Sequence, residues 1–247
     1  MKQSQFYYLL RRGLFSAGSA IIKNGLVMFN KFTTAGISHP AQGSAEFNGT
    51  SDYIDVDPLP LSNWDNFTYS AWVYADAIGS TFNILGFGNN SNNTPLSLIE
   101  IRSTGTINFI TRDDSSVVCQ ATTTDTINSK NWYFITGKKD GSSCELYIDG
   151  SLSASGTGAP STPTLNTFSI GRLERTSPIN FFDGNLANVA IWNRALSSDE
   201  INSVMWKSYE ALSGAESNGL QAWYSLDDIS GTSVPDSSGN GNTGTAN

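Results

Sequence analysis

Histidine is nearly absent from this sequence, which limits the catalysis that the chain can perform. His39 is the only histidine among 247 residues and stands directly before Pro40. A Ser–His–Asp triad or a histidine-rich metal site would have to be built around this single residue. We interpret His39 as a loop residue and expect no enzyme activity that depends on histidine.

Cysteine is scarce as well. Cys119 and Cys144 are the only two, and their spacing does not match a metal-binding C-x-x-C pair. Both fall in predicted strands, which is compatible with a disulfide and equally with two buried thiols. The number of cysteines alone does not determine the redox compartment.

Long apolar runs are missing too. No run approaches the roughly 20 residues that a membrane-spanning helix needs, so we expect no membrane insertion. The apolar run of residues 6–10 ends at Arg11 and Arg12, before it reaches the length of a signal-peptide core. We therefore expect no signal peptide, and we expect a protein that acts outside the cell to leave it by lysis or as part of a particle.

Acidic residues are absent from the first 45 positions, which contain five lysines and arginines. Because the whole chain carries −8 and this segment carries +5, the rest of the chain carries −13. The sequence pI near 4.5 argues against nucleic-acid binding by the whole protein. A basic segment on an acidic body instead indicates that the segment contacts an anionic partner.

The basic segment, residues 1–43, also has a helical pattern. Apolar residues three and four positions apart predict a helix over residues 3–20, with an apolar stripe that should be buried on a partner. We interpret the segment as an assembly arm; the alternatives are a solvated helix and a helix that packs on its own domain. The residues that define the arm are Phe6, Leu10, Arg11, Arg12 and Leu14.

From residue 44 onward, short apolar runs alternate with turn residues, and the chain contains 23 glycines. Residues 65–76 carry aromatic and β-branched side chains at both alternating positions, as expected of a central strand. The absence of a β-α-β alternation predicts an all-β protein in which two antiparallel sheets form a sandwich. The other predicted strands are residues 96–103, 106–111, 132–136, 145–148, 151–155, 167–171 and 186–192.

Two short patterns predict local structure. Asn24-Gly25 stands between apolar runs and predicts a hairpin turn. Ser197 is followed three residues later by Glu200, which forms a capping box and predicts the start of a helix. We expect that helix to end near Ser213-Gly214.

Three groups of residues carry a family resemblance. They are AEFNGTSDYIDV (45–56) with FTYSAWV (67–73), WYF (132–134) with LYIDG (146–150), and FDG (182–184) with VAIWNRALS (189–197). In this order and spacing they resemble the laminin-G-like jelly-roll domains of phage and bacterial surface proteins, in the concanavalin A-like lectin/glucanase superfamily. The resemblance covers residues 44–247. It implies a two-sheet antiparallel jelly roll. Together with the helix predicted after Ser197 and the segment 1–43, which lies outside the resemblance, the expected fold is an all-β jelly roll with one short helix in its C-terminal half, preceded by a helical or extended arm.

The segment that normally opens such a domain stands at the end of this chain. GLQAWYSLD (219–227) and DSSGNGNTGT (236–245) are similar to that opening segment, and only a degenerate copy, GLVMF (25–29), stands near the start. Residues 218–247 would then complete the domain's own sheet, as in a circular permutation, or pair with a neighbouring subunit. The sequence leaves both arrangements open.

The resemblance also implies metal sites on the rim of some members. Calcium takes oxygen ligands from carboxylates, amides and main-chain carbonyls. Asp236, Asn240 and Asn242 lie in a glycine-rich turn of that kind, and Asp183 could approach from the FDG loop. These four residues are our candidate calcium ligands; the alternative is that Asp236 and the glycines only form turns.

Sugar binding and sugar hydrolysis have different requirements. Trp64 and Trp206 are the tryptophans that we expect to be exposed enough to stack on a sugar, whereas Trp72, Trp132 and Trp192 fall in strand patterns. A glycosidase needs two carboxylates at a controlled separation, and no E-x-D-x-x-E pattern provides them. We therefore expect a protein without enzyme activity.

These observations favour a structural or adhesive protein of a virus particle, namely a capsid decoration (cement) protein or a tail-fibre component on the surface of a bacteriophage. The expected partners are other virion proteins, further copies of the chain and a host-surface glycan. The alternatives are a secreted or cell-surface carbohydrate-binding module and a divergent glycoside hydrolase.

Overall fold

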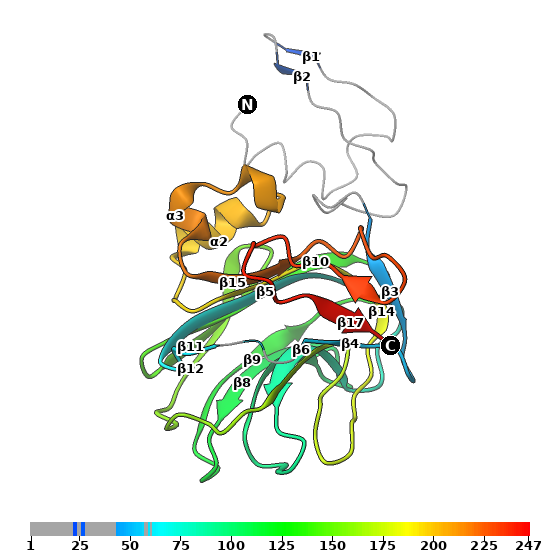
Figure 1. Cartoon of the computed structure of the whole chain (residues 1–247). Coiled ribbons are helices and arrows are strands. Elements are labelled where there is room, and N and C mark those ends of the chain that lie inside the picture. The colour runs from blue at the N-terminus through cyan, green and yellow to red at the C-terminus, as the bar shows by residue number, and fades with distance from the viewer. Residues whose placement is uncertain (1–21, 24–25, 28–42, 57–58, 60) are drawn as a thin grey trace.

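The computed structural model describes residues 22–23, 26–27, 43–56, 59 and 61–247 (Figure 1). The predicted helix over residues 3–20 and the five arm residues lie outside these ranges. Strands β1 (Ile22–Lys23) and β2 (Leu26–Val27) pair antiparallel, as the hairpin predicted at Asn24-Gly25 requires.

Two antiparallel sheets pack on one another and confirm the predicted sandwich (Figure 1). Sheet I contains, in order across the sheet, β12 (Ser151–Thr157), β11 (Ser143–Ile148), β10 (Trp132–Asp140), β5 (Asn66–Ala75), β14 (Asp183–Trp192) and β15 (Leu220–Tyr224), and β3 (Ala45–Asn48) also pairs with β14. Sheet II contains β16 (Ser233–Val234), β17 (Gly244–Ala246), β4 (Ile54–Asp55), β13 (Thr167–Ile170), β6 (Phe82–Gly88), β7 (Leu96–Ile101), β8 (Thr106–Arg112) and β9 (Val118–Thr126).

Strand β5 is buried on both faces, as its sequence pattern predicts. Phe67 and Tyr69 point into the core between the sheets, whereas Trp72 points to the opposite side of sheet I. The strand lies between β10 and β14, so neither of its faces nor its edges is exposed. This position explains the apolar residues at both alternating positions.

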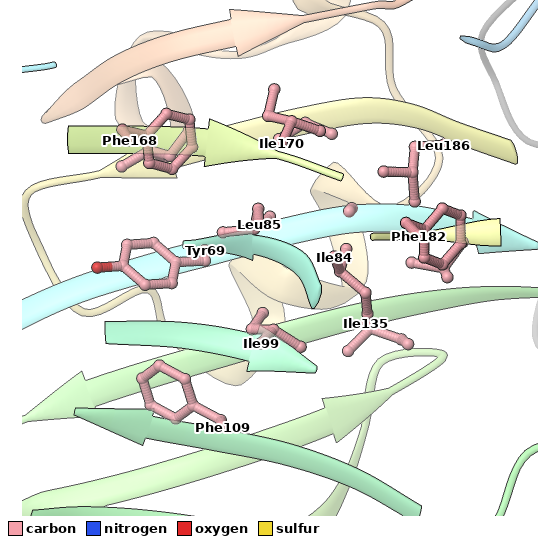
Figure 2. Packing of buried hydrophobic residues seen from close by; sticks show 14 of the residues in the cluster. Tyr69, Ile84, Leu85, Ile99, Phe109, Ile135, Phe168, Ile170, Phe182 and Leu186 are labelled. Atoms are coloured by element: carbon pink, nitrogen blue, oxygen red, sulfur yellow. The ribbon is translucent and has the colours of Figure 1, made fainter. Parts of the chain in front are cut away.

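The core between the sheets is built from aromatic and branched side chains (Figure 2). Phe109 of β8 and Tyr69 of β5 are both fully buried, with ring centroids 6.1 Å apart. The Tyr69 hydroxyl is 3.0 Å from Ser97 Oγ, which is 2.9 Å from Thr111 Oγ1. Burial raises the pKa of the Tyr69 hydroxyl, and the hydroxyl chain satisfies polar groups that would otherwise destabilise the core.

The helix predicted after Ser197 is present, but it is shorter than expected. Helix α2 (Ser198–Val204) begins with the predicted capping box. The predicted end near Ser213-Gly214 is wrong, because the N–H groups of Trp206 and Lys207 donate to carbonyls three residues back and tighten the last turn. Ser213 instead caps a second helix, α3 (Gly214–Ser217), after the 3₁₀ turn η1 (Tyr209–Ala211).

The helices cover the outer face of sheet I (Figure 1). Ile201, Val204 and Met205 of the helical segment pack on the tryptophans of β5, β14 and β15. Trp72 Nε1 donates to Met205 O at 3.1 Å, and Trp192 Nε1 donates to Glu216 O at 2.7 Å. Buried tryptophans need such acceptors, which explains why the helices sit here.

The C-terminal segment completes the sheets of its own chain. β15 pairs with β14 in sheet I, and β17 pairs with β4 in sheet II. Tyr53 and Asn247 exchange two backbone hydrogen bonds, so the end of the chain lies beside the start of the domain. In this structure residues 218–247 therefore pair with strands of their own chain, and the circular permutation stays a prediction.

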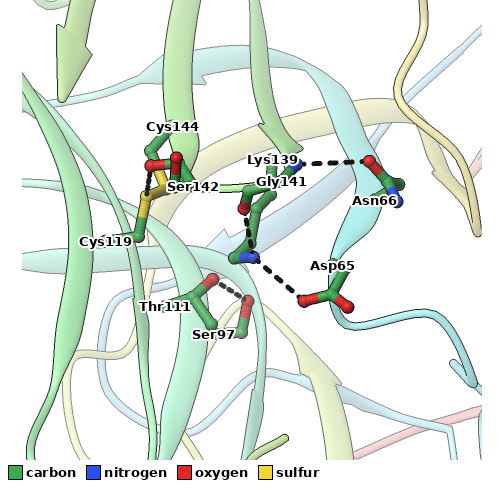
Figure 3. The surroundings of a disulfide bond; sticks show 9 residues. All are labelled: Asp65, Asn66, Ser97, Thr111, Cys119, Lys139, Gly141, Ser142 and Cys144. Carbon is green, nitrogen blue, oxygen red and sulfur yellow. Dashed lines mark hydrogen bonds and ion pairs between the residues drawn. A yellow bond between two sulfur atoms is a disulfide. The ribbon is translucent and has the colours of Figure 1, made fainter. Parts of the chain in front are cut away.

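Cys119 of β9 and Cys144 of β11 form a disulfide, with their Cα atoms 5.8 Å apart (Figure 3). Because β9 belongs to sheet II and β11 to sheet I, the bond links the two sheets at one end of the sandwich. The strands approach closely there: a Cβ built on Gly156 would lie 1.7 Å from the carbonyl oxygen of Gln120.

Candidate functional site

No described helix covers the outer face of sheet II (Figure 1), and polar side chains of β7, β8 and β9 lie on it. In β7 the side chains alternate, so that Ile99 and Ile101 belong to the core while Glu100 points outward. Asn108 of β8 is directly opposite Glu100, and Thr122 of β9 is opposite Asn108. Three neighbouring strands therefore place polar groups in one row.

Hydrogen bonds hold this row in place. Asn108 Nδ2 donates to Glu100 Oε1 at 2.9 Å, while Asn108 Oδ1 accepts from Gln120 Nε2 and Thr122 Oγ1, both at 2.8 Å. Asn108 is only 1% exposed. We call Glu100, Asn108, Gln120 and Thr122 the polar ladder. Its side chains are fixed before any ligand arrives, so binding would cost little side-chain entropy.

A surface hollow of about 480 Å³ lies at one end of the ladder. Glu100, Arg102 and six serine or threonine side chains line it. Arg102 Nε lies 3.5 Å from Glu100 Oε1, and the Arg102 side chain is 42% exposed. The hollow thus offers a carboxylate, a guanidinium and several hydroxyl groups to a polar ligand.

The loop between β13 and β14, residues 171–182, packs on the other part of this face. Leu173 contacts Leu96 and Leu98 of β7 and anchors the loop there. Beyond this anchor, Arg175 of the loop and Arg112 of β8 donate to the same acceptor, the carbonyl oxygen of Asn93. Two guanidinium groups therefore lie next to one another at the far end of the face.

The tryptophans expected to bind sugar have structural contacts. Trp64 is half-buried and packs edge to face on Phe67 and Phe87, which closes one edge of the core. Trp206 is half-buried, and its ring lies 5.8 Å from that of Trp72 under the helices. The two lie apart from the polar ladder, in different packing clusters, and their role in sugar binding stays a prediction.

The turn that contains Asp236 is held by hydrogen bonds within the chain. Asp236 Oδ1 accepts from the N–H groups of Trp223 and Ser238, and Oδ2 accepts from the N–H of Asn242. The side-chain amides of Asn240 and Asn242 both donate to the carbonyl oxygen of Gln221. These bonds explain the motif as a turn that fastens the C-terminal segment to β15.

The structure does not bring Asp183 to this turn. Asp183 is opposite Asn48 at the start of β14, whereas Trp223, which donates to Asp236, is opposite Ala190. Seven strand positions separate the two places, which corresponds to roughly 20 Å. In the described part of the chain, no three His, Cys, Asp or Glu side chains come close enough to hold a metal ion. Calcium binding at Asp236 stays a prediction.

The sequence analysis missed the polar ladder, although its signal is present. Glu100, Asn108 and Gln120 are polar residues at alternating positions of three consecutive strands. Only the strand pairing shows that they point to the same side. Cys119 was expected in a strand, but the bounds of that strand, β9, were not predicted, because its threonine-rich sequence resembles a loop as much as a strand. The described helices include none with the length and apolar character that a membrane crossing requires.

Comparison with protein families identifies the domain. Residues 48–202 match the family described as the concanavalin A-like lectin/glucanases superfamily. This stretch is more than half of the chain and contains all strands of the polar ladder. No curated protein matches the chain.

Solved structures share the same fold at low identity. A Bacteroides ovatus protein predicted to bind carbohydrate is 20% identical with a TM-score of 0.59, covering 82% of this chain and 57% of its own length. A heptameric SAP-like pentraxin from Limulus polyphemus is 17% identical with a TM-score of 0.54, covering 78% of this chain and 91% of its own. The CBM40 of the Ruminococcus gnavus IT-sialidase is 16% identical with a TM-score of 0.55, and the match covers 67% of this chain and 98% of the CBM40 chain.

Proposed function

We propose that this chain, which belongs to the concanavalin A-like lectin/glucanases superfamily, binds carbohydrate through the outer face of sheet II and catalyses no reaction on it. The polar ladder is the observation that carries the proposal. Carboxylate, amide, hydroxyl and guanidinium groups line an open face beside a hollow of about 480 Å³. Such groups exchange hydrogen bonds with the hydroxyl groups of a sugar.

The composition of the hollow supports binding over hydrolysis. Glycoside hydrolases generally place two carboxylates about 5 to 10 Å apart around the scissile bond. Glu100 is the one carboxylate among the described residues that line the hollow. Its Oε1 accepts a hydrogen bond from Asn108 and lies 3.5 Å from Arg102 Nε, so this oxygen is already engaged by two neighbouring side chains.

The structural neighbours also support this proposal. The Bacteroides ovatus protein is predicted to bind carbohydrate, and the Ruminococcus gnavus CBM40 has been solved with α2,3-sialyllactose. This chain spans 57% of the Bacteroides ovatus protein, so the activity of that whole protein is not transferred here. The pentraxin is heptameric, and we include self-association in the proposal.

Asn108→Ala should weaken glycan binding about tenfold or more, because it removes the amide that positions Glu100, Gln120 and Thr122. The measurement is binding of the full chain to an oligosaccharide panel that contains uronic acid, sialylated and sulfated members beside neutral glucose, galactose and mannose oligomers, followed by titration calorimetry on those bound.

Asn128→Ala is the matched control, since Asn128 is exposed in the loop between β9 and β10, outside the ladder. The affinity of this variant should stay within about twofold of that of the wild type. Gln120→Ala keeps the buried Asn108 and should also weaken binding if Asn108→Ala proves unstable. The proposal fails if the wild type binds no member of the panel with a Kd below about 1 mM.

The disulfide supports a location outside the cytoplasm. Disulfides form and persist in oxidising environments such as the extracellular space and particle surfaces. Cys119 and Cys144 link the two sheets, so we propose an extracellular or surface setting, consistent with a glycan ligand.

We further propose that residues 1–43 attach this domain to a larger particle, as in a bacteriophage decoration or fibre protein. The support is the charge pattern, with five basic and no acidic residues in the first 45 positions. Deleting residues 2–20 should abolish self-assembly or attachment and leave the melting temperature nearly unchanged. Light scattering and calorimetry of the deletion variant test this; unfolding of the whole domain would contradict it.

A further inference from the structure

Two arginines on the outer face of sheet II form no ion pair with any described residue. Residues 44–247 contain nine lysines and arginines, and six of them pair with carboxylates. The exposed Lys130 does not, and neither do Arg112 and Arg175, although this part of the chain carries a net charge of −13. Arginines without a carboxylate are unexpected in so acidic a body, where partners for them are abundant.

These two arginines also share an acceptor. Arg112 Nη2 and Arg175 Nη2 donate to the carbonyl oxygen of Asn93 at 3.0 and 2.9 Å. Arg112 Nε donates to the neighbouring carbonyl of Thr94. Arg175 Nε is buried and has no hydrogen-bond partner in the described structure. Two positive charges therefore converge on one neutral oxygen.

The surrounding charges leave an excess of positive charge here. Burial lowers the pKa of Arg175, Arg112 lowers it further, and Glu100 is the carboxylate that opposes them. Glu100 is also the ion-pair partner of Arg102. Glu100 is thus shared between Arg102 and Arg175, Glu174 pairs with Arg172, and no described carboxylate forms an ion pair with Arg112. This end of the face therefore has room for a further negative charge.

We propose that Arg112 and Arg175 form a subsite for an anionic group of the glycan, a carboxylate or a sulfate, so that the ligand of this protein is an acidic oligosaccharide. This rests on the proposed function, because the subsite lies on the same face as the polar ladder. Guanidinium groups bind such anions through paired N–H donors. The acidic remainder of the body repels anions, which would confine their binding to this end of the face.

The competing explanation is that the two arginines only fasten residues 93 and 94 to sheet II. Arg175→Gln separates the two explanations in binding experiments with the full chain and the oligosaccharide panel above. The proposal requires that the bound members are uronic acid, sialylated or sulfated oligosaccharides. It also requires that Arg175→Gln weakens their binding about tenfold or more. Comparing carboxylated with sulfated members identifies the anionic group.

Lys130→Gln is the matched control, because it removes the same charge from an exposed lysine in another turn. It should leave the affinity within about twofold. Arg175→Lys keeps the charge but loses the planar donor pair, and an intermediate affinity is expected. The affinity of this variant, together with the melting temperatures of Arg175→Gln, Arg175→Lys and Lys130→Gln, separates loss of binding from loss of folding.

Equal affinity for neutral and acidic members, or equal weakening by Arg175→Gln and Lys130→Gln, would overturn the anionic subsite. A third outcome separates the two proposals: neutral glycans bind, Asn108→Ala weakens their binding, and Arg175→Gln does not. In that case the proposed function stands and the anionic subsite is wrong. If no member of the panel binds, both proposals fail.

Discussion

Replacing Cys119 and Cys144 together with alanine should lower the free energy of unfolding by about 3 to 4 kcal/mol. The disulfide closes a loop with a sequence separation of 25. Without this cross-link the unfolded chain gains conformational entropy, which lowers its free energy by about this amount. For a domain of this size the melting temperature should fall by roughly 10 °C. The loss of stability should be largest at the end of the sandwich where the disulfide joins β9 of one sheet to β11 of the other.

Reduction provides the control for this prediction. Wild-type protein unfolded and refolded in reducing agent should melt near the temperature of the double variant, and the variant should not respond to reductant. Calorimetry in the presence and absence of reductant measures both. Equal melting temperatures for the oxidised wild type and the variant would show that the bond contributes nothing to stability.

Phe109→Ala should cost about 3 to 5 kcal/mol, the range for large-to-small changes of a buried phenylalanine. Phe109 is fully buried in the core, where its ring lies 6.1 Å from that of Tyr69 between the centroids (Figure 2). Its centroid is also 6.0 Å from that of Phe67. The substitution leaves a cavity that the flanking rings cannot fill without leaving their rotamers. Denaturant unfolding of the variant measures the loss.

Gly137 provides an internal test of this explanation. A Cβ built on Gly137 would lie 2.6 Å from Phe109 Cδ2, so Gly137→Ala alone should destabilise the protein by about 1 to 3 kcal/mol. In the Phe109→Ala background the same change has space and should be neutral or stabilising. Additive losses would contradict the contact. Leu152→Ala is the surface control, because Leu152 is 56% exposed, and it should change stability by less than about 0.5 kcal/mol.

The site proposed from the structure and the sites predicted from the sequence consist of different kinds of residue. The sequence drew attention to tryptophans and to the DSSGNGN turn, which are conspicuous because they are large or rare. In the structure Trp64 and Trp206 seal packing clusters, and Asp236 accepts three backbone hydrogen bonds. The polar ladder consists of ordinary residues whose importance comes only from their alignment across strands.

Local chemistry sufficed for several features that depend on neighbouring residues. The burial of β5 on both faces and the capping box at Ser197 follow from a few adjacent residues. The second capping box, Ser213 to Glu216, obeys the same rule and could have been predicted in the same way. The sandwich followed because many short strands with turn signals bury their apolar sides only by packing sheet on sheet.

Tertiary structure decided the features that need partners far apart in the chain. The link between Cys119 and Cys144 and the pairing of β15 with β14 depend on strand order. So does the meeting of Arg112 with Arg175. Strand order in an antiparallel sandwich is set by the summed packing of whole sheets, because each single cross-strand pair contributes less than about 1 kcal/mol. A side chain's partner across the sheet is therefore not encoded by its neighbours in sequence, and the candidate glycan site became visible only once the sheets were assembled.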